Sequence, residues 1–277
     1  MMIYEHIFQI YRNDRGYSIY NFWFVLEMVN MIQSIERGIE ILNLLKSGPL
    51  GVTELASATA LPKTTVHRLL KTFEAHHWVE LNSTLKKYQL SWGILPMAKS
   101  FLTSLDVRAI AQPYMVAIRN QLQQSVNLFL AQGDYRICIE RVAADKPLRH
   151  DIKIGTVYPI FKGAAGKIFG AYLADFEDAD MSADESAKIR RDGYVITRGN
   201  RVPDAASIAV PIFSFGNKLE AVMTISGPIG DYTEERVKEY LSAIRVLGQT
   251  ISKERLYNKC WGDTTTVSLP TLFFCKK

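Results

Sequence analysis

The sequence predicts an α+β fold with two domains joined by a helix, and three observations support this prediction. A chain of 277 residues is long enough for two cores of moderate size. Hydrophobic residues make up 48% of the chain and charged residues 22%, which excludes a disordered chain. Helical patterns with one hairpin come first, and a mixture of helices and short strands follows.

The segment 31–91 begins with three short helical patterns. Ser34 is the expected cap of the first helix, which Gly48 and Pro49 end. Thr53 is the expected cap of the second helix, and the third begins at Pro62, because proline is tolerated in a first turn. Alternating runs at 78–81 and 87–90 then predict a hairpin. Three helices followed by a hairpin outline a winged helix-turn-helix.

The third helix has one apolar and one polar face. Val66, Leu69, Leu70 and Phe73 recur at helical spacing and predict the packed face. On the polar face, arginine can bind guanine, threonine can contact a base edge, and lysine can neutralise phosphate. A net charge of +5 mildly favours a polyanionic partner, although a solvated face is the alternative. The residues expected to contact double-stranded DNA are Lys63, Thr64, Thr65, His67, Arg68, Lys71, Lys86 and Lys87.

The rest of the chain divides into four segments. Residues 92–106 predict a linker helix that starts or kinks near Pro96. Residues 107–256 predict a mixed α/β domain. Residues 1–30 are expected to be a poorly integrated extension, and 257–277 an irregular tail. Within the mixed domain we expect strands at 126–131, 136–142, 148–154, 208–215 and 221–226, and helices at 110–122, 163–172 and 234–256.

Composition and motifs argue against membrane, metal and enzymatic roles. The apolar run at 22–26 is far shorter than the roughly 20 residues of a spanning helix. Cys138, Cys260 and Cys275 are scattered along the chain, so we expect no disulfide, no metal site and no cofactor. The same cysteine usage leads us to expect a cytoplasmic location. Residues 163–167 lack the neighbours of a phosphate loop, and no GxSxG motif occurs. Adjacent His150 and Asp151 would point to opposite faces of a strand.

A DNA-binding domain followed by a mixed α/β domain is typical of a ligand-responsive regulator. Two alternative functions remain open. One is an enzyme that acts on a small molecule in the C-terminal domain, whose mark would be a group of titratable residues in a pocket. The other is an architectural DNA-binding protein with no ligand, whose C-terminal domain would lack an enclosed polar pocket.

Several motifs resemble those of the IclR family of bacterial transcriptional regulators. Residues 31–42, MIQSIERGIEIL, resemble the opening of that family, and residues 61–70, LPKTTVHRLL, resemble its recognition helix. The similarity extends in order over roughly residues 31–256. Further matches are 88–90 (YQL), 104–108 (SLDVR), 166–167 (GK), 193–194 (GY), 207–211 (SIAVP) and 225–228 (ISGP).

The resemblance implies a repressor of a catabolic operon that forms a homodimer or homotetramer on a pseudo-palindromic operator. It also implies a GAF-like domain that binds a small carboxylate or sugar acid. The chain departs from the family at one point: the family has a Pro-Leu-His stretch before the small residues, and here the order is Pro159-Ile160-Phe161-Lys162. Lys162 either contacts the ligand or points to solvent. A loop at 197–200 is expected to close over the site. The implied effector-binding residues are Ala164, Ala165, Thr197, Ser207, Thr224 and Ser226.

Overall fold

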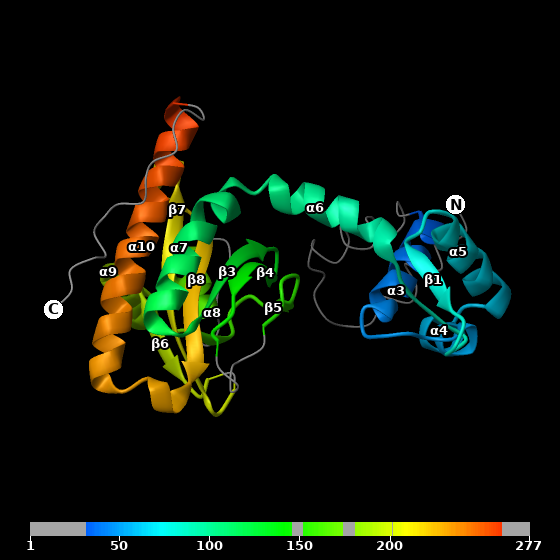
Figure 1. Ribbon diagram of the computed structural model, residues 1–277, viewed down its shortest axis with the longest axis horizontal. Coiled ribbons are helices and arrows are strands. Elements are labelled where there is room, and N and C mark those ends of the chain that lie inside the picture. The colour runs from blue at the N-terminus through cyan, green and yellow to red at the C-terminus, as the bar shows by residue number, and fades with distance from the viewer. Residues whose placement is uncertain (1–31, 146–151, 174–180, 201, 262–277) are drawn as a thin grey trace, which may run out of the picture. The chain divides into compact units, whose positions relative to one another are not determined.

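The computed structural model describes residues 32–145, 152–173, 181–200 and 202–261. The chain divides into two compact units with the boundary between Ala98 and Lys99 (Figure 1), inside the segment predicted as a linker. The predicted extension at residues 1–30 lies outside the described residues. No described helix is long and apolar enough to cross a membrane.

The N-terminal unit is a winged helix-turn-helix, as predicted. Its elements are α3 (Gln33–Leu45), α4 (Val52–Thr59), α5 (Lys63–Ala75), β1 (Val79–Asn82) and β2 (Lys87–Leu90). The two strands pair antiparallel, with Val79 opposite Leu90 and Asn82 opposite Lys87. Apolar side chains from all five elements form one core, which consists of Ile41, Leu45, Leu55, Ala56, Val66, Leu70, Val79 and Tyr88.

Both expected helix caps in this unit are wrong. Ser34 lies inside α3, whose N-cap is Ile32. The carbonyl of Ile32 accepts the backbone N–H groups of Ile35 and Glu36 at 2.9 and 3.2 Å, so the helix begins before Ser34. Thr53 lies inside α4, whose N-cap is Gly51. Gly51 has no side chain to cap with, and its own N–H donates to Glu54 Oε2 at 2.6 Å. The start of α4 is therefore stabilised by a carboxylate within the helix instead of by a side chain at the N-cap.

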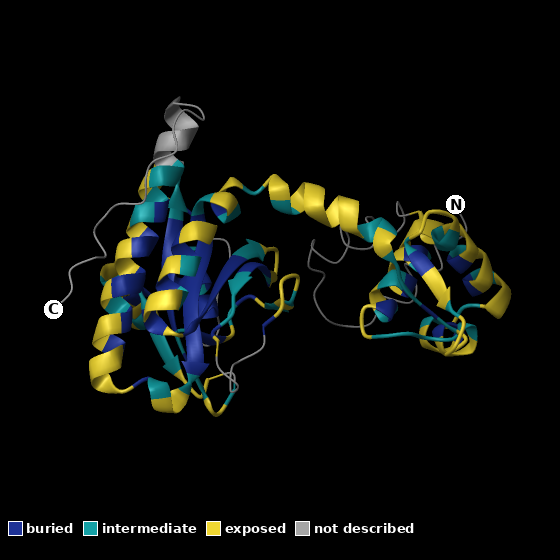
Figure 2. Cartoon of the chain, viewed as in Figure 1, coloured by how far each residue is buried: buried dark blue, intermediate teal, exposed yellow. Residues whose placement is uncertain are grey.

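The segment predicted as a linker helix is a short 3-10 helix, η1 (Trp92–Ile94), followed by α6 (Leu95–Thr103). Helix α6 begins at Leu95 and Pro96 lies in its first turn, so of the two predicted alternatives the structure has the helix start near Pro96. No residue of α6 is buried, as Figure 2 shows, and Leu95, Met97 and Phe101 are exposed apolar side chains.

The C-terminal unit is a six-stranded antiparallel sheet with helices on both faces, in the strand order β5-β4-β3-β8-β7-β6. Helices α7 and α10 cover one face, while α8 covers the other and contacts α9 (Figure 1). The elements are α7 (Asp106–Leu122), β3 (Ser125–Gln132), β4 (Tyr135–Val142), β5 (Val157–Pro159), α8 (Gly163–Tyr172), α9 (Ala183–Asp192), β6 (Val195–Arg198), β7 (Ala205–Ser214), η2 (Phe215–Asn217), β8 (Lys218–Pro228), η3 (Ile229–Asp231) and α10 (Glu234–Trp261).

Two predictions for this unit need correction, and some of its elements were not predicted. Residues 152–154 are not in a strand; a turn at Gly155 instead leads into β5. Residues 148–151 of that predicted strand lie outside the described residues. β6 and α9 were not predicted, although Ser182 caps α9 and Gly193 ends it. Helix α10 continues to Trp261, so 257–261 are not irregular, because no glycine or proline occurs from residue 249 to residue 261.

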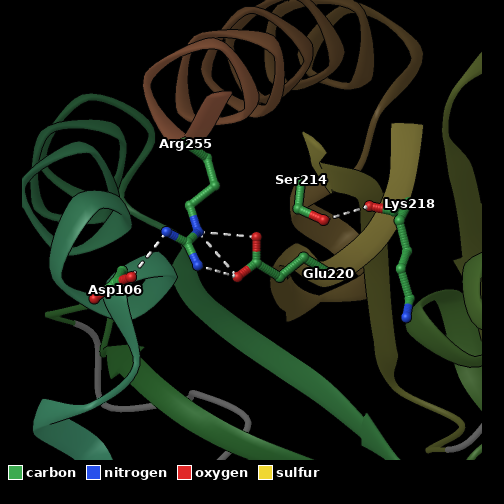
Figure 3. Close-up of polar contacts among 5 residues, drawn as sticks. All are labelled: Asp106, Ser214, Lys218, Glu220 and Arg255. Atoms are coloured by element: carbon green, nitrogen blue, oxygen red, sulfur yellow. Dashed lines mark hydrogen bonds and ion pairs between the residues drawn. The ribbon is translucent and has the colours of Figure 1, made fainter. Parts of the chain in front are cut away.

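Arg255 joins three elements of the C-terminal unit (Figure 3). Its guanidinium donates to both carboxylate oxygens of Glu220 on β8 at 2.8–2.9 Å, and to Asp106 at the start of α7 at 2.9 Å. The side chains of Arg255 and Glu220 are only 15% and 19% exposed. Because bidentate pairs fix geometry, Arg255 holds α10 and α7 against the sheet at this end.

We predict that Arg255→Met lowers the free energy of unfolding by roughly 1–3 kcal/mol, because Glu220 is left shielded from water without its partner. Urea denaturation followed by circular dichroism measures the change. Lys218→Met removes the same charge from an exposed position on β8 (Figure 3) and should alter stability by less than about 0.5 kcal/mol. Equal losses in the two variants would contradict the structural role of Arg255.

Candidate functional site

Helix α5 presents a polar face opposite its packed face. Val66 and Leu70 are fully buried, and Leu69 and Phe73 are partly buried, as the helical spacing predicts. Of the α5 residues expected to contact DNA, Thr65 is half-buried and the others are exposed: Lys63, Thr64, His67, Arg68 and Lys71. The ammonium of Lys71 lies 2.6 Å from Glu74 Oε2. Cations and hydroxyls thus share one accessible helix face.

The β1–β2 hairpin, or wing, contacts α4 and the segment just before that helix. Lys87 Nζ lies 2.8 Å from Glu54 Oε1, and a backbone bridge joins Leu50 to Tyr88. The pKa of Glu54 is lowered by the N–H of Gly51 and then by Lys87. Lys86, by contrast, is exposed at the turn of the wing, with a positive φ of 52°. The two lysines of the wing therefore differ: Lys87 orients the wing, and Lys86 points outward.

A cavity of about 50 Å³ lies in the C-terminal unit, between the first turn of α8 and the sheet. All six residues implied as effector-binding line it: Ala164, Ala165, Thr197, Ser207, Thr224 and Ser226. The other lining residues among the described ones are Phe129, Arg136, Ile152, Tyr158, Gly163, Asn200, Val202, Ala205 and Ala206.

Strand register brings the hydroxyl groups of this cavity together. Thr197 of β6 lies opposite Ser207 of β7, and Ser207 lies opposite Ser226 of β8. Paired residues of antiparallel strands point to the same face, so these three form a row across the sheet. Two residues before Ser226 on β8, and therefore on the same face, Thr224 lies opposite Asn127 of β3. The alternation of Thr224 and Ser226 around Ile225, which predicts a shared face, agrees with this register.

Hydrogen bonds orient these hydroxyl groups for different roles. Asn127 Nδ2 donates to Thr224 Oγ1 at 3.3 Å and to Ser226 Oγ at 3.2 Å. Both hydroxyls act as acceptors there, so their own hydrogens can be donated to a ligand. Ser207 instead donates to the carbonyl of Ile225 at 3.1 Å, which leaves its oxygen able to accept. The site thus offers both donors and an acceptor.

The first turn of α8 forms the opposite wall of the cavity. Gly163 has a φ of 75°, and its N–H donates to Asn200 Oδ1 at 3.0 Å. The next first-turn N–H groups, of Ala164 and Ala165, are at the positive end of the helix dipole, where anions bind favourably. A Cβ on Gly166 would lie 2.1 Å from the carbonyl carbon of Phe161, so only glycine permits this close approach.

The structure corrects one expectation about this region, decides a second and adds a residue that was missed. Thr197 and Arg198 lie in strand β6, so only residues 199 and 200 of the predicted loop lie outside a strand, and Asn200 lines the cavity. Lys162 is exposed and does not line the cavity, which supports the solvent interpretation. Arg136 was missed although its side chain is only 3% exposed, because an arginine in an alternating strand usually indicates the solvent face.

Other reactive groups do not form a catalytic arrangement in the described part of the chain. Cys138 is fully buried, and burial raises the pKa of its thiol to about 12. Such a thiol is a poor nucleophile at neutral pH. The described residues include no group of three side chains able to hold a metal ion. His150, Asp151 and Cys275 lie outside the described residues, and Cys260 lies within α10.

Comparison with known proteins gives matches over both units. The model of the IclR helix-turn-helix domain matches residues 34–83, and that of the bacterial transcriptional regulator IclR C-terminal domain matches residues 99–183 and 176–253. The transcriptional repressor IclR of Escherichia coli is 27% identical over 232 residues, covering 76% of this chain and 85% of the relative.

Solved structures show the same fold. An IclR-type regulator from Alicyclobacillus acidocaldarius has a TM-score of 0.69 at 22% identity, covering 80% of this chain and 98% of that one. An IclR homologue from Microbacterium hydrocarbonoxydans, solved with 4-hydroxybenzoate, has a TM-score of 0.67 at 18% identity, covering 80% and 100%. The curated relatives are transcriptional regulators, several of them named as of the helix-turn-helix type or as DNA-binding. The chain belongs to the IclR family of bacterial transcriptional regulators.

Proposed function

We propose that this regulator is a repressor of a catabolic operon whose affinity for DNA changes when a small organic or sugar acid binds the cavity of its C-terminal unit. The observation that carries the proposal is the cavity itself, which collects helix N–H groups and hydroxyls in one place. The 4-hydroxybenzoate bound by a structural neighbour is an acid of this class and supports the choice.

The DNA contacts that we propose come from α5 and the wing. Arg68 is exposed in the middle of the polar face of α5, and its planar fork suits the two major-groove acceptors of guanine. The exposed Lys86 at the wing turn suits a phosphate, which carries no sequence information. Lys87 contributes by holding the wing to α4 through Glu54.

We also propose that two or four copies bind a pseudo-palindromic operator. A twofold-symmetric protein matches a site of two inverted half-sites. Exposed apolar side chains on α3 and α6 support pairing with a second copy, since such side chains gain by being covered. They are Ile35, Ile39, Leu95, Met97 and Phe101.

We predict that Arg68→Ala relaxes sequence preference at one base position in each half-site, with a loss of about 1–3 kcal/mol on the preferred base. Lys86→Ala should instead weaken binding to all sequences and lower the salt dependence by about one phosphate contact. Competition mobility-shift assays with operator variants, repeated at two salt concentrations, measure both effects.

Lys99→Ala, on the exposed part of α6, serves as the charge control and should leave base preference unchanged. If Arg68→Ala kept the operator preference of the unmodified chain, α5 would not read bases through this residue. If Lys86→Ala altered preference at a single base, Lys86 would be a base contact rather than a phosphate contact.

We predict that Ser226→Val abolishes the response to an acid that alters operator binding by the unmodified chain. The substitution removes a buried hydroxyl from the cavity wall and replaces it with methyl groups. Operator affinity without acid should stay within about twofold, as measured by mobility shift. Thr250→Val, an isosteric change outside the cavity lining, should respond normally. A normal response in Ser226→Val would remove this serine from the site.

A further inference from the structure

Arg136 places a buried guanidinium in the wall of the cavity. It lies on β4, is only 3% exposed, and lines the cavity together with Phe129 and Tyr158. Its Nη1 donates to the carbonyls of Pro159 and Ile160, at 2.8 Å each. The carbon of the guanidinium lies 5.6 Å from the ring centre of Phe129 and 5.3 Å from that of Tyr158. Two carbonyls and two aromatic rings therefore fix its plane.

The charge of Arg136 stands out in this lining. Among the described residues that line the cavity, Arg136 has the only formal charge, and none is an aspartate or glutamate. Its Nη2 lies 3.9 Å from the position that a Cβ on Gly163 would occupy, so it is beside the first turn of α8. Two positive features, the guanidinium and the N-terminal end of the helix dipole, thus meet at one point of the wall.

We propose that Arg136 selects the effector by charge, so that the cavity binds a small hydroxy-carboxylate. The carboxylate would be bound by Arg136, the N–H groups of Ala164 and Ala165, and the donor hydroxyls of Thr224 and Ser226. The ligand hydroxyl would donate to Ser207, whose own hydrogen is given to Ile225. This inference rests on the proposed function, because it names the class of acid that the same cavity takes.

A fixed arginine suits this role better than a lysine would. Its planar fork can present two parallel N–H groups to a carboxylate, whereas an ammonium acts as a point charge. The aromatic contacts of Arg136 also depend on a flat cation. Arg136→Lys should therefore keep the preference for an acid while binding it less tightly.

Calorimetric titration of the full chain tests the inference with pairs of probes that differ in charge. The pairs are lactate with lactamide, and 4-hydroxybenzoate with 4-hydroxybenzamide. We expect the unmodified chain to bind at least one acid more than about tenfold tighter than its amide. In Arg136→Gln that ratio should fall by about tenfold or more, and in Arg136→Lys it should fall less. Lys162→Gln, which removes an exposed charge beside α8, should preserve the ratio.

The ratio of acid to amide separates charge selection from a merely structural role, because a distorted cavity would weaken both probes together. An unchanged ratio in Arg136→Gln would overturn the role of Arg136 and leave the acid-responsive regulator intact. A chain that binds none of the acids, or binds the amides equally well, would overturn the acid class and with it this part of the proposed function. If Arg136→Gln fails to fold, the ratios of the unmodified chain and Arg136→Lys decide: equal affinity for acid and amide in either one rejects the inference.

Discussion

The structure of the C-terminal unit depends on a sheet that is buried on both faces but polar on part of one. Asn127, Thr224 and Ser226 are each less than 5% exposed, yet they carry amide and hydroxyl groups. Burying such groups is costly unless they are hydrogen-bonded, and the two bonds from Asn127 to the hydroxyls offset that cost. The polar patch is thereby held in a fixed orientation toward α8, where a cavity remains.

The two faces of the sheet have different roles: one stabilises the fold, and the other carries the proposed ligand-binding cavity. On the face covered by α7 and α10, apolar residues such as Ile208, Met223 and Ile225 form a continuous core. On the other face, Thr224 and Ser226 of the polar patch line the cavity together with Ala164 and Ala165 of the first turn of α8. A ligand that bridges α8 and the sheet would change how these two elements are held together. Such a change is the kind of local event that can shift a regulator between two states.

Local patterns predicted much of this molecule, and contacts between distant segments explain what they missed. Helical spacing on α5 and strand alternation around Ile225 depend only on neighbouring residues, so the packed helix face and the shared side of Thr224 and Ser226 were predictable. The short strand β5 pairs with β4, a strand distant from it in the sequence, and no periodicity within three residues can reveal such a pairing. Arg136 was missed because its burial comes from carbonyls more than twenty residues away, at Pro159 and Ile160.

The proposed function requires that an acid bound in the cavity changes the affinity of α5 for DNA. The most direct test is a mobility-shift titration of the full chain on DNA that flanks its own gene, at two salt concentrations. Small organic acids, their neutral amides, or no ligand are added. We predict a specific complex whose affinity one acid changes and its amide does not. A specific complex that no acid alters, or no specific complex at all, would contradict the claim.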